Sequence, residues 1–445
     1  MTTVVILAAG KGTRMKSALP KVLHRVCGRS LLGWALGAAR EGGATRLVLV
    51  LGEQRERVLQ DLLEQGELEA PGRLAGGLPV EVVVQEPQLG TGHALQVAAP
   101  ALATEREQIL VTYGDMPVLT GQTLRALCAA RPEQGACVLA AEVPRPKGYG
   151  RLIEGSGGHL EAIVEERDAT PAQRRIRRVN VGVYAFPADL PSFLGRLSNH
   201  NAQGEYYLTD AIALLLGAGR AVRTLDLEDL AEARGVNTLA ELAEARRSLQ
   251  ARILEQHLLA GVQIEDPDST WIDHGVSIGA RTVILPASVI RRGVVIGSDC
   301  EVGPFSHLRE GTVLADHAAV GNFTETKQAS LGEHSKAKHL AYLGDVDVGA
   351  HTNIGAGTIV ANYDGVRKHR TQIGSGAFIG SGSILVAPSR VGDGALTGAG
   401  AVLTRKEVPP GEAWVGIPAR SLGPRPASTL KTPGEKRKPA PGGAG

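Results

Sequence analysis

The chain has 445 residues and a formal net charge of +2, and 43% of its residues are hydrophobic. This length exceeds what one hydrophobic core usually holds, so we expect two or more domains. The nearly balanced charge argues against nucleic acid or an acidic membrane surface as a partner, and we expect small-molecule substrates instead.

The cysteines and the N-terminus indicate the compartment. The four cysteines are scattered without CxxC or CxxH spacing, and we expect them to be reduced: Cys27, Cys128, Cys137 and Cys300. No signal peptide precedes Val4, and no apolar run is long enough to span a bilayer. The sequence therefore predicts a cytoplasmic protein.

The first part of the chain alternates between apolar runs and helical segments. Residues 3–9 form a continuous apolar run of the kind found in buried parallel strands. Further strands are predicted at 46–51, 80–85, 108–112 and 136–142. Strands that alternate with helices predict a doubly wound α/β domain, whose ligand should lie at the carboxyl ends of the strands.

A glycine-rich basic loop, residues 10–15, follows the first predicted strand directly. It matches neither the Walker A motif nor the dinucleotide GxGxxG motif, and a structural turn is the alternative interpretation. Its position, its side chains Lys11 and Arg14, and its backbone N–H groups favour a triphosphate site.

Two further loops should reach the same edge of the sheet. Residues 85–94 are rich in groups that can bond a nucleobase edge. Asp115 follows a central strand, where a carboxylate can hold Mg²⁺ beside phosphate oxygens; the alternative is a turn residue or a helix cap. A helix is predicted over 238–260, and Asn237 before it is a good N-cap.

The second part of the chain repeats every six residues from Ile272 to about Leu403. Aliphatic residues mark the period, a glycine often follows them, and the register slips after Val320 and Val360. This period predicts a hexapeptide β-helix, in which three hexapeptides form one triangular coil.

Arg309 and Lys327 stand one full coil apart, each directly after an inward residue. They should therefore stack on one outer edge at roughly 4.8 Å. Like charges this close are unfavourable unless an anion lies against both, and a sugar phosphate would serve as that anion. Two solvated side chains that point apart are the alternative.

The breaks in the period contain the other candidate residues. His339 lies between lysines in the segment 336–342 and is a candidate general base, although a surface histidine is the alternative. The segments 353–358 and 361–368 lie beside the same breaks.

The motif LAAGKGTRM with Pro20-Lys21 resembles the sugar-nucleotide pyrophosphorylases. With QLGTGHA, YGD and the hexapeptide array, residues 3–415 resemble the bifunctional bacterial family of N-acetylglucosamine-1-phosphate uridylyltransferase/glucosamine-1-phosphate acetyltransferase. The resemblance implies an α/β fold with a Rossmann-like nucleotidyltransferase domain at 1–236, a linker helix at 237–260 and a left-handed parallel β-helix at 261–420. It also implies Mg²⁺, the substrates UTP and acetyl-CoA, a homotrimer formed through the β-helix, and a product used in cell-wall synthesis.

In the N-terminal domain the resemblance implies phosphate-positioning roles for Arg14 and Lys21 and Mg²⁺ ligands at Asp115 and Asn237. The implied UTP and sugar-nucleotide positions are Leu7, Ala8, Ala9, Gly10, Lys21, Gln85, Gly90, Thr91, Tyr113, Gly114, Asp115, Gly150, Glu165, Asn180 and Asn237.

In the β-helix the resemblance implies that His339 is the general base, with Glu325 as a candidate partner that orients or polarises it. The implied sugar-phosphate positions are Arg309, Lys327, Tyr342, Asn353 and Asn362, and the implied acetyl-CoA positions are Ala356, Asn362, Tyr363, Lys368, Ser381 and Ala399.

The sequence departs from the family near its end. An arginine near the coenzyme A phosphates is expected around 415–418, where this chain reads Val-Gly-Ile-Pro, so Arg420 is the candidate replacement. Residues 421–445 lack periodicity, and we expect a disordered tail there. Two alternatives remain: a single-activity sugar-1-phosphate nucleotidyltransferase with a structural β-helix, and a non-catalytic regulatory relative.

Overall fold

The computed structural model describes residues 2–103, 108–155 and 159–424. The chain forms two compact units, one up to Leu249 and one from Gln250, and each is described by itself. The division falls inside α7 (Leu239–Leu259), the helix predicted over 238–260.

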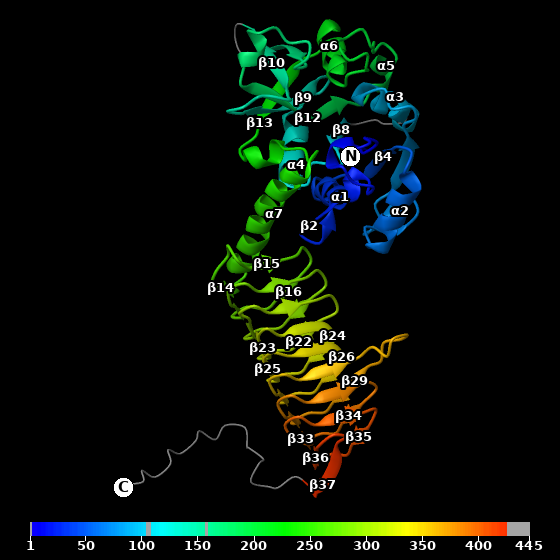
Figure 1. Ribbon diagram of the computed structural model, residues 1–445. Coiled ribbons are helices and arrows are strands. Elements are labelled where there is room, and N and C mark those ends of the chain that lie inside the picture. The colour runs from blue at the N-terminus through cyan, green and yellow to red at the C-terminus, as the bar shows by residue number, and fades with distance from the viewer. Residues whose placement is uncertain (1, 104–107, 156–158, 425–445) are drawn as a thin grey trace, which may run out of the picture. The chain divides into compact units, whose positions relative to one another are not determined.

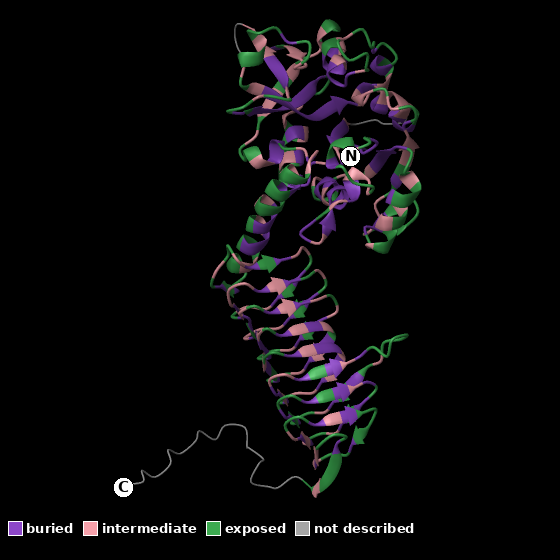
Figure 2. Ribbon diagram, in the orientation of Figure 1, coloured by how far each residue is buried: buried purple, intermediate pink, exposed green. Residues whose placement is uncertain are grey.

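The first unit is built on a parallel sheet in the order β7-β4-β1-β8. The strands are β1 (Thr2–Leu7), β4 (Arg46–Leu51), β7 (Val80–Val84) and β8 (Gln108–Tyr113). β1 and β4 are buried almost throughout because helices cover both faces of the sheet, which explains their continuous apolar sequences (Figure 2). The predicted strands are confirmed to within a few residues.

Antiparallel strands extend the sheet beyond β8. Here β12 (Arg178–Pro187) pairs with β8, β9 (Ala136–Glu142) and β10 (Gly150–Glu154). β10 also pairs antiparallel with β11 (Leu160–Val164), whereas β9 pairs parallel with β13 (Val222–Asp226).

Two hydrophobic cores lie on the two faces of this sheet. One contains the buried residues of α1 (Leu31–Glu41), α2 (Arg55–Glu64) and α4 (Gly121–Ala130). The other contains those of α3 (Thr91–Leu102), α5 (Pro191–Leu194) and α6 (Thr209–Gly217). The shorter elements are η1 (Thr13–Met15), η2 (Lys21–Leu23), β2 (Arg25–Val26), β3 (Arg29–Ser30), β5 (Leu68–Ala70), β6 (Arg73–Leu74), η3 (Gln173–Arg175) and η4 (Leu230–Ala233).

The second unit is a parallel β-helix, seen as stacked short strands in Figure 1. The inward positions of the six-residue period are buried, from Ile272 (fully buried) and Leu308 to Leu403. One face consists of β14 (Gln263–Ile264), β17 (Val283–Ile284), β20 (Glu301–Val302), β23 (Ala319–Asn322), β25 (Lys336–His339), β27 (Asn353–Ile354), β30 (Phe378–Ile379), β33 (Leu396–Thr397), β36 (Glu412–Val415) and β37 (Arg420–Pro424).

The other two faces share the long strands β24 (Glu325–Leu331) and β26 (Tyr342–Val348), which bend from one face onto the next. The second face also contains β15 (Trp271–Ile272), β18 (Val289–Ile290), β21 (His307–Leu308), β28 (Ile359–Ala361), β31 (Ile384–Val386) and β34 (Val402–Thr404). The third contains β16 (Ser277–Ile278), β19 (Val295–Ile296), β22 (Val313–Leu314), β29 (Thr371–Ile373), β32 (Arg390–Val391) and β35 (Glu407–Val408).

The last strand corrects one expectation. Residues 421–424, expected to begin a disordered tail, belong to β37, which pairs antiparallel with β36. The six-residue period ends before these residues, so it predicts no partners for their backbone N–H and C=O groups. Pairing with β36 supplies those partners and so orders residues 421–424. Residues 425–445 lie outside the described residues. All four cysteines are free, as expected for reduced residues.

Candidate active sites

The glycine-rich loop and η2 approach each other closely at the carboxyl end of β1. Gly12 has φ = 63°, and a Cβ atom there would stand 2.5 Å from the Cβ atom of Lys21. Glycine is therefore needed at position 12, because this position requires a positive φ and leaves no room for a side chain. The loop after β8 reaches the same edge, where Gly114 donates its N–H to the Leu7 carbonyl oxygen at 3.0 Å.

Four of the predicted residues form one polar cluster. The Lys21 ammonium is ion-paired with Asp115, and it also donates a hydrogen bond to Asn237 Oδ1 at 3.1 Å. Arg14 donates to the same oxygen at 2.8 Å. The side chains of Lys21 and Asp115 are only 12% and 17% exposed. The Asp115 carboxylate and the Asn237 amide oxygen thus converge on one cationic atom.

Asn237 does not cap α7, which corrects the alternative interpretation of this residue. The Asn237 and Thr238 N–H groups both donate to Glu241 Oε2, at 2.7 and 2.8 Å. The Thr238 hydroxyl in turn accepts from the Glu241 N–H at 3.2 Å. Thr238 and Glu241 therefore form a capping box, and the Asn237 side chain is left to face the cluster.

A cavity of about 370 Å³ opens beside this cluster. Its lining includes Leu7, Ala8, Ala9, Gly10, Lys21, Gln85, Gly90, Thr91, Tyr113 and Asp115, all predicted from the sequence. Gln88 and Glu205 also line it, and neither was predicted as a ligand. The structure thus brings most of the predicted nucleotide positions into one cavity.

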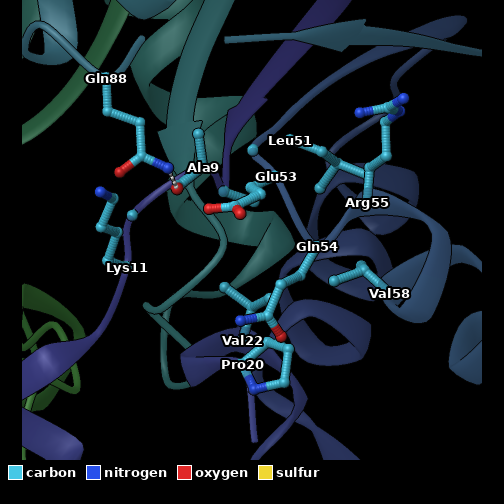
Figure 3. A pocket seen from close by; sticks show the side chains of 13 residues that line it. Ala9, Lys11, Pro20, Val22, Leu51, Glu53, Gln54, Arg55, Val58 and Gln88 are labelled. Carbon is cyan, nitrogen blue, oxygen red and sulfur yellow. Dashed lines mark hydrogen bonds between the residues drawn. The ribbon is translucent and has the colours of Figure 1, made fainter. Parts of the chain in front are cut away.

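A smaller hollow of about 180 Å³ adjoins this cavity and shares Ala8, Ala9, Gly10 and Gln88 with it. Figure 3 shows the Gln88 amide pointing to the Ala9 carbonyl oxygen, to which it donates a hydrogen bond. Gln88 therefore ties the loop after β7 to the loop after β1, which keeps both walls of the cavity together.

The loop 85–92 packs tightly against residues 205–208. A Cβ atom at Gly90 would stand 2.5 Å from the Tyr206 carbonyl oxygen, and one at Gly92 would stand 2.7 Å from that of Tyr207. Gly92 donates its N–H to Tyr206 at 2.7 Å. These two glycines thus serve a close backbone approach, which explains the GTG sequence independently of any ligand.

The three predicted sugar positions lie together: Gly150 on β10, Glu165 directly after β11 and Asn180 on β12. Gly150 is paired with Asn180, and a Cβ atom at Gly150 would stand 3.6 Å from the Glu165 carboxyl carbon. Burial raises the pKa of Glu165, while the hydrogen bond from Thr209 opposes that shift. Asn180 donates to the Tyr184 hydroxyl at 2.6 Å and accepts from Gly182 at 3.1 Å.

Tyr113 links these positions to the nucleotide cavity. Burial raises the pKa of its hydroxyl well above the ordinary value, with smaller contributions from Glu165 and Asp115. The hydroxyl therefore stays protonated near neutral pH and can donate a hydrogen bond.

In the β-helix, the register confirms that Arg309 and Lys327 follow paired inward residues. Leu308 is paired with Thr326, so the two cations are neighbours on the second face. Lys368, from the insertion after Val360, lowers the pKa of Lys327, and Arg309 adds to this effect. Three cationic side chains thus gather on this face.

Glu325 contacts Arg309 in this chain. Its carboxylate accepts a hydrogen bond from Arg309 Nη1 at 2.7 Å. A contact between Glu325 and His339 is not among the hydrogen bonds of the described residues; Glu325 lies on the second face and His339 at the end of a first-face strand. The role of Glu325 as a partner of His339 stays a prediction.

Tyr342 and Asn362 adjoin the cationic group. Lys327 is paired with Gly344, and a Cβ atom at Gly344 would stand 2.7 Å from the Tyr342 hydroxyl and 2.8 Å from Asn362 Nδ2. Asn362 also donates to the Asp345 carboxylate. Gly344 thus leaves the space into which these two polar side chains turn.

His339 lies in a column with three predicted acetyl-CoA positions. Ala337, Ile354, Ile379 and Thr397 are stacked inward residues of the first face, and the residue two places after each is His339, Ala356, Ser381 and Ala399. Backbone hydrogen bonds from Gly382 to Ala356 and from Gly400 to Ser381 join the later coils of this column, whereas Gly357 donates to Leu340, the residue after His339.

The other predicted residues of the β-helix lie on separate features. Asn353 lies on β27, paired with Lys336 and Phe378 on the first face. Tyr363 and Lys368 face each other across the turn of the insertion. Arg420 is paired with Val415 at the start of β37. Within one chain, Asn353 and the cationic group thus lie on different faces.

The comparisons with known proteins agree with both units. The family model of the MobA-like NTP transferase domain matches residues 4–191, and that of the bacterial transferase hexapeptide (six repeats) matches residues 370–405. "Bifunctional protein GlmU" of Pelobacter propionicus is 44% identical over 92% of this chain and 94% of its own. The chain belongs to the GlmU family.

Other GlmU family members match as closely. The protein of Thermobifida fusca is 44% identical over 94% of this chain and 93% of its own, and that of Nocardia farcinica is 45% identical over 95% of this chain and 92% of its own.

Among solved structures, one titled as a putative glucose-1-phosphate thymidylyltransferase from Bacillus anthracis covers 56% of this chain and 94% of its own, with 19% identity and a TM-score of 0.44.

The membership makes this chain a bifunctional enzyme with a nucleotidyltransferase unit and a hexapeptide acetyltransferase unit. None of the helices in the described ranges is long and apolar enough to cross a membrane. Sequence reasoning placed Gln88 in a candidate nucleotide-binding loop without naming it or Glu205 as a ligand. It missed the capping box, although the Thr-x-x-Glu spacing at 238–241 was a signal for it.

Proposed function

We propose that the chain makes UDP-N-acetylglucosamine in two steps at two separate sites. The β-helix transfers an acetyl group from acetyl-CoA to glucosamine 1-phosphate. The first unit then joins the product to UTP and releases pyrophosphate. The observation that supports this most is that each unit gathers its own group of cations beside a polar site, one around Lys21 and one around Lys327.

In the nucleotidyl transfer, an oxygen of the sugar phosphate attacks the α-phosphorus of UTP, and the bond from that phosphorus to the pyrophosphate oxygen breaks. The protein needs little acid–base chemistry for this step, because both reacting groups are already ionised phosphates. Arg14, Lys21 and the loop amides around Gly10 position the phosphates and neutralise their charge.

The cluster fits a Mg²⁺ ion. Asp115 and Asn237 offer a carboxylate and an amide oxygen that already converge on one cation, the Lys21 ammonium. Mg²⁺ prefers oxygen ligands and is commonly held by one or two protein groups together with substrate phosphates and water. Bound there, Mg²⁺ would neutralise phosphate charge, and Lys21 would turn from the two oxygens towards the phosphates.

In the acetyl transfer, the sugar amine attacks the thioester carbonyl, and the sulfur of coenzyme A leaves. His339 takes the proton of the amine as general base. Arg309 and Lys327 hold the sugar phosphate, Tyr342 and Asn362 lie beside it, and Lys368, predicted at the acetyl-CoA site, lies next to Lys327. The column of Ala356, Ser381 and Ala399 gives the acetyl-CoA an extended path on which to lie.

The β-helix would assemble into a homotrimer, with each acetyl-transfer site formed between subunits. Asn353 lies on a different face from Lys327 within one chain, so a neighbouring copy would have to bring these two positions together. Large apolar side chains beside His339 are also exposed, with Phe323 at 57% and Leu340 at 61%. Association would remove this apolar surface from water.

The alternative is a single-activity nucleotidyltransferase with a structural β-helix. A purely structural array has no use for three adjacent cations, so the group around Lys327 favours the bifunctional enzyme.

The two half-reactions test the proposal separately. With UTP, N-acetylglucosamine 1-phosphate and Mg²⁺, the wild type should release pyrophosphate and Asp115→Ala should not. With acetyl-CoA and glucosamine 1-phosphate, both proteins should release coenzyme A at the same rate. Loss of both reactions in Asp115→Ala would contradict two separate sites.

A further inference from the structure

Three histidines stack on one corner of the β-helix. The rings of His317 and His334 have centroids 4.5 Å apart and are inclined by 8°. The rings of His334 and His351 have centroids 5.0 Å apart and are inclined by 16°. This histidine ladder has no role in the proposed activity.

The ladder follows from the backbone. The three histidines have φ values of 60°, 58° and 55°, and each occupies the same corner on successive coils. The His334 N–H donates to Asp316 at 3.2 Å, and the His351 N–H donates to Glu333 at 2.8 Å. His334 and His351 therefore each bond to the residue just before the histidine of the preceding coil. These bonds hold the rings in register.

A carboxylate completes the group. Glu333 Oε1 stands 3.4 Å from His334 Nε2. One ligand atom each from His317, Glu333 and His334 lie within 4.8 Å of one another. Histidine tolerates left-handed corners better than most residues, which explains each histidine singly. That preference does not explain a glutamate within reach of two stacked rings.

We propose that His317, Glu333 and His334 bind a divalent transition metal ion of the zinc type. Two imidazoles and one carboxylate form a ligand set suited to Zn²⁺, with the remaining position open to water. Mg²⁺ prefers oxygen ligands to imidazole, so this site would bind a different kind of metal ion from the Mg²⁺ site proposed at Asp115.

Metal binding requires the rings of His317 and His334 to leave their near-parallel stack, because an imidazole nitrogen binds a metal in the plane of its ring and these planes are inclined by only 8°. Zn²⁺ lies about 2.0–2.2 Å from nitrogen and oxygen ligands, so the three ligand atoms must draw somewhat closer together than they are. The three residues are exposed, so rotation of their side chains meets little obstruction. The ion would link two successive coils of the β-helix through side chains as well as backbone.

The test measures Zn²⁺ bound to the full chain after equilibrium dialysis at micromolar ZnCl₂ with excess Mg²⁺. The wild type should hold one more ion per chain than His334→Asn or His317→Asn. Asparagine suits the positive φ at both positions, so these variants should keep the fold, which circular dichroism checks. The Zn²⁺ affinity of the site should fall at least about tenfold with either change, since loss of even an outer-shell partner costs that much.

Two variants serve as controls. His351→Asn changes a histidine in the same backbone conformation outside the proposed ligand set, and His200→Asn changes an exposed histidine in the first unit. Both should keep the wild-type Zn²⁺ content. Equal Zn²⁺ content in the wild type and His334→Asn would overturn the proposal. An equal loss in His351→Asn and His334→Asn would overturn the assigned ligands.

Discussion

Asn237 Oδ1 accepts a hydrogen bond from the Lys21 ammonium at 3.1 Å, although 216 residues separate them in the chain. The contact joins the segment before α7 to the helix η2 near the start of the chain. The Thr238–Glu241 capping box makes this contact possible. The box satisfies the backbone N–H groups at the start of α7, so the Asn237 side chain is not needed there.

Asn237→Ala should therefore lower nucleotidyl transfer with little loss of stability. We expect a fall in kcat/KM of about 10–100-fold, which corresponds to one lost bond to a charged group. The matched change Thr238→Ala removes the cap and should lower the free energy of unfolding by about 1 kcal/mol while activity at low temperature is kept. Steady-state kinetics and urea unfolding of both variants check this. A reversal of the two patterns would show that Asn237 is a structural residue.

The glycines at 10 and 90 should respond differently to alanine. Gly90 has φ = 108° and an added Cβ atom would meet the Tyr206 carbonyl oxygen, so Gly90→Ala should destabilise the first unit by about 1–3 kcal/mol. Gly10 has open space around its Cβ position. Gly10→Ala should keep the stability and instead raise the KM for UTP, since the methyl group enters the cavity. Thermal unfolding and kinetics distinguish the two, and equal destabilisation would contradict the proposed difference.

The buried carboxyl of Glu165 should make stability depend on pH. Burial raises its pKa in the folded state, so its contribution to stability is full below the ordinary carboxyl pKa and is lost as the pH rises through the raised value. The difference in unfolding free energy, wild type minus Glu165→Gln, should thus fall as the pH is raised from acidic to slightly alkaline values. Urea unfolding across this range measures it, with the exposed Glu56→Gln as the control. A difference that rises with pH would contradict the stated direction.

The cations on the second face should act on the sugar phosphate. Lys327→Ala should raise the KM for glucosamine 1-phosphate about 10–100-fold, because one charged contact to the phosphate is lost. Lys338→Ala is the matched control, since Lys338 is ion-paired with Glu301 at 2.9 Å. Acetyl-transfer kinetics check the pair. A rise in the KM for acetyl-CoA alone would assign Lys327 to the other substrate.

The sequence predicted both domains because each has a strong periodic signal. Continuous apolar runs indicated β1 and β4, and the six-residue period indicated the inward column from Ile272 to Leu403. The pairing of Arg309 with Lys327 followed from the length of one coil and needed no side-chain detail.

Side-chain partners were harder to predict. The bond between Glu325 and Arg309, its neighbour on the second face, was not predicted from the sequence. Lys368 comes beside Lys327 only because the insertion after Val360 folds back, and no periodicity extends through that insertion. The role of Gly90 in a close approach to Tyr206 depends on a contact between segments that are far apart in the sequence.

The most direct test of two separable sites is a mass-spectrometric assay with glucosamine 1-phosphate, acetyl-CoA, UTP and Mg²⁺. The wild type should form UDP-N-acetylglucosamine. His339→Ala should form none until N-acetylglucosamine 1-phosphate is added, and then should form it at the wild-type rate. If the wild type forms product only when the acetylated sugar is supplied, the β-helix has no acetyltransferase activity, and the roles proposed for Arg309, Lys327 and His339 are wrong.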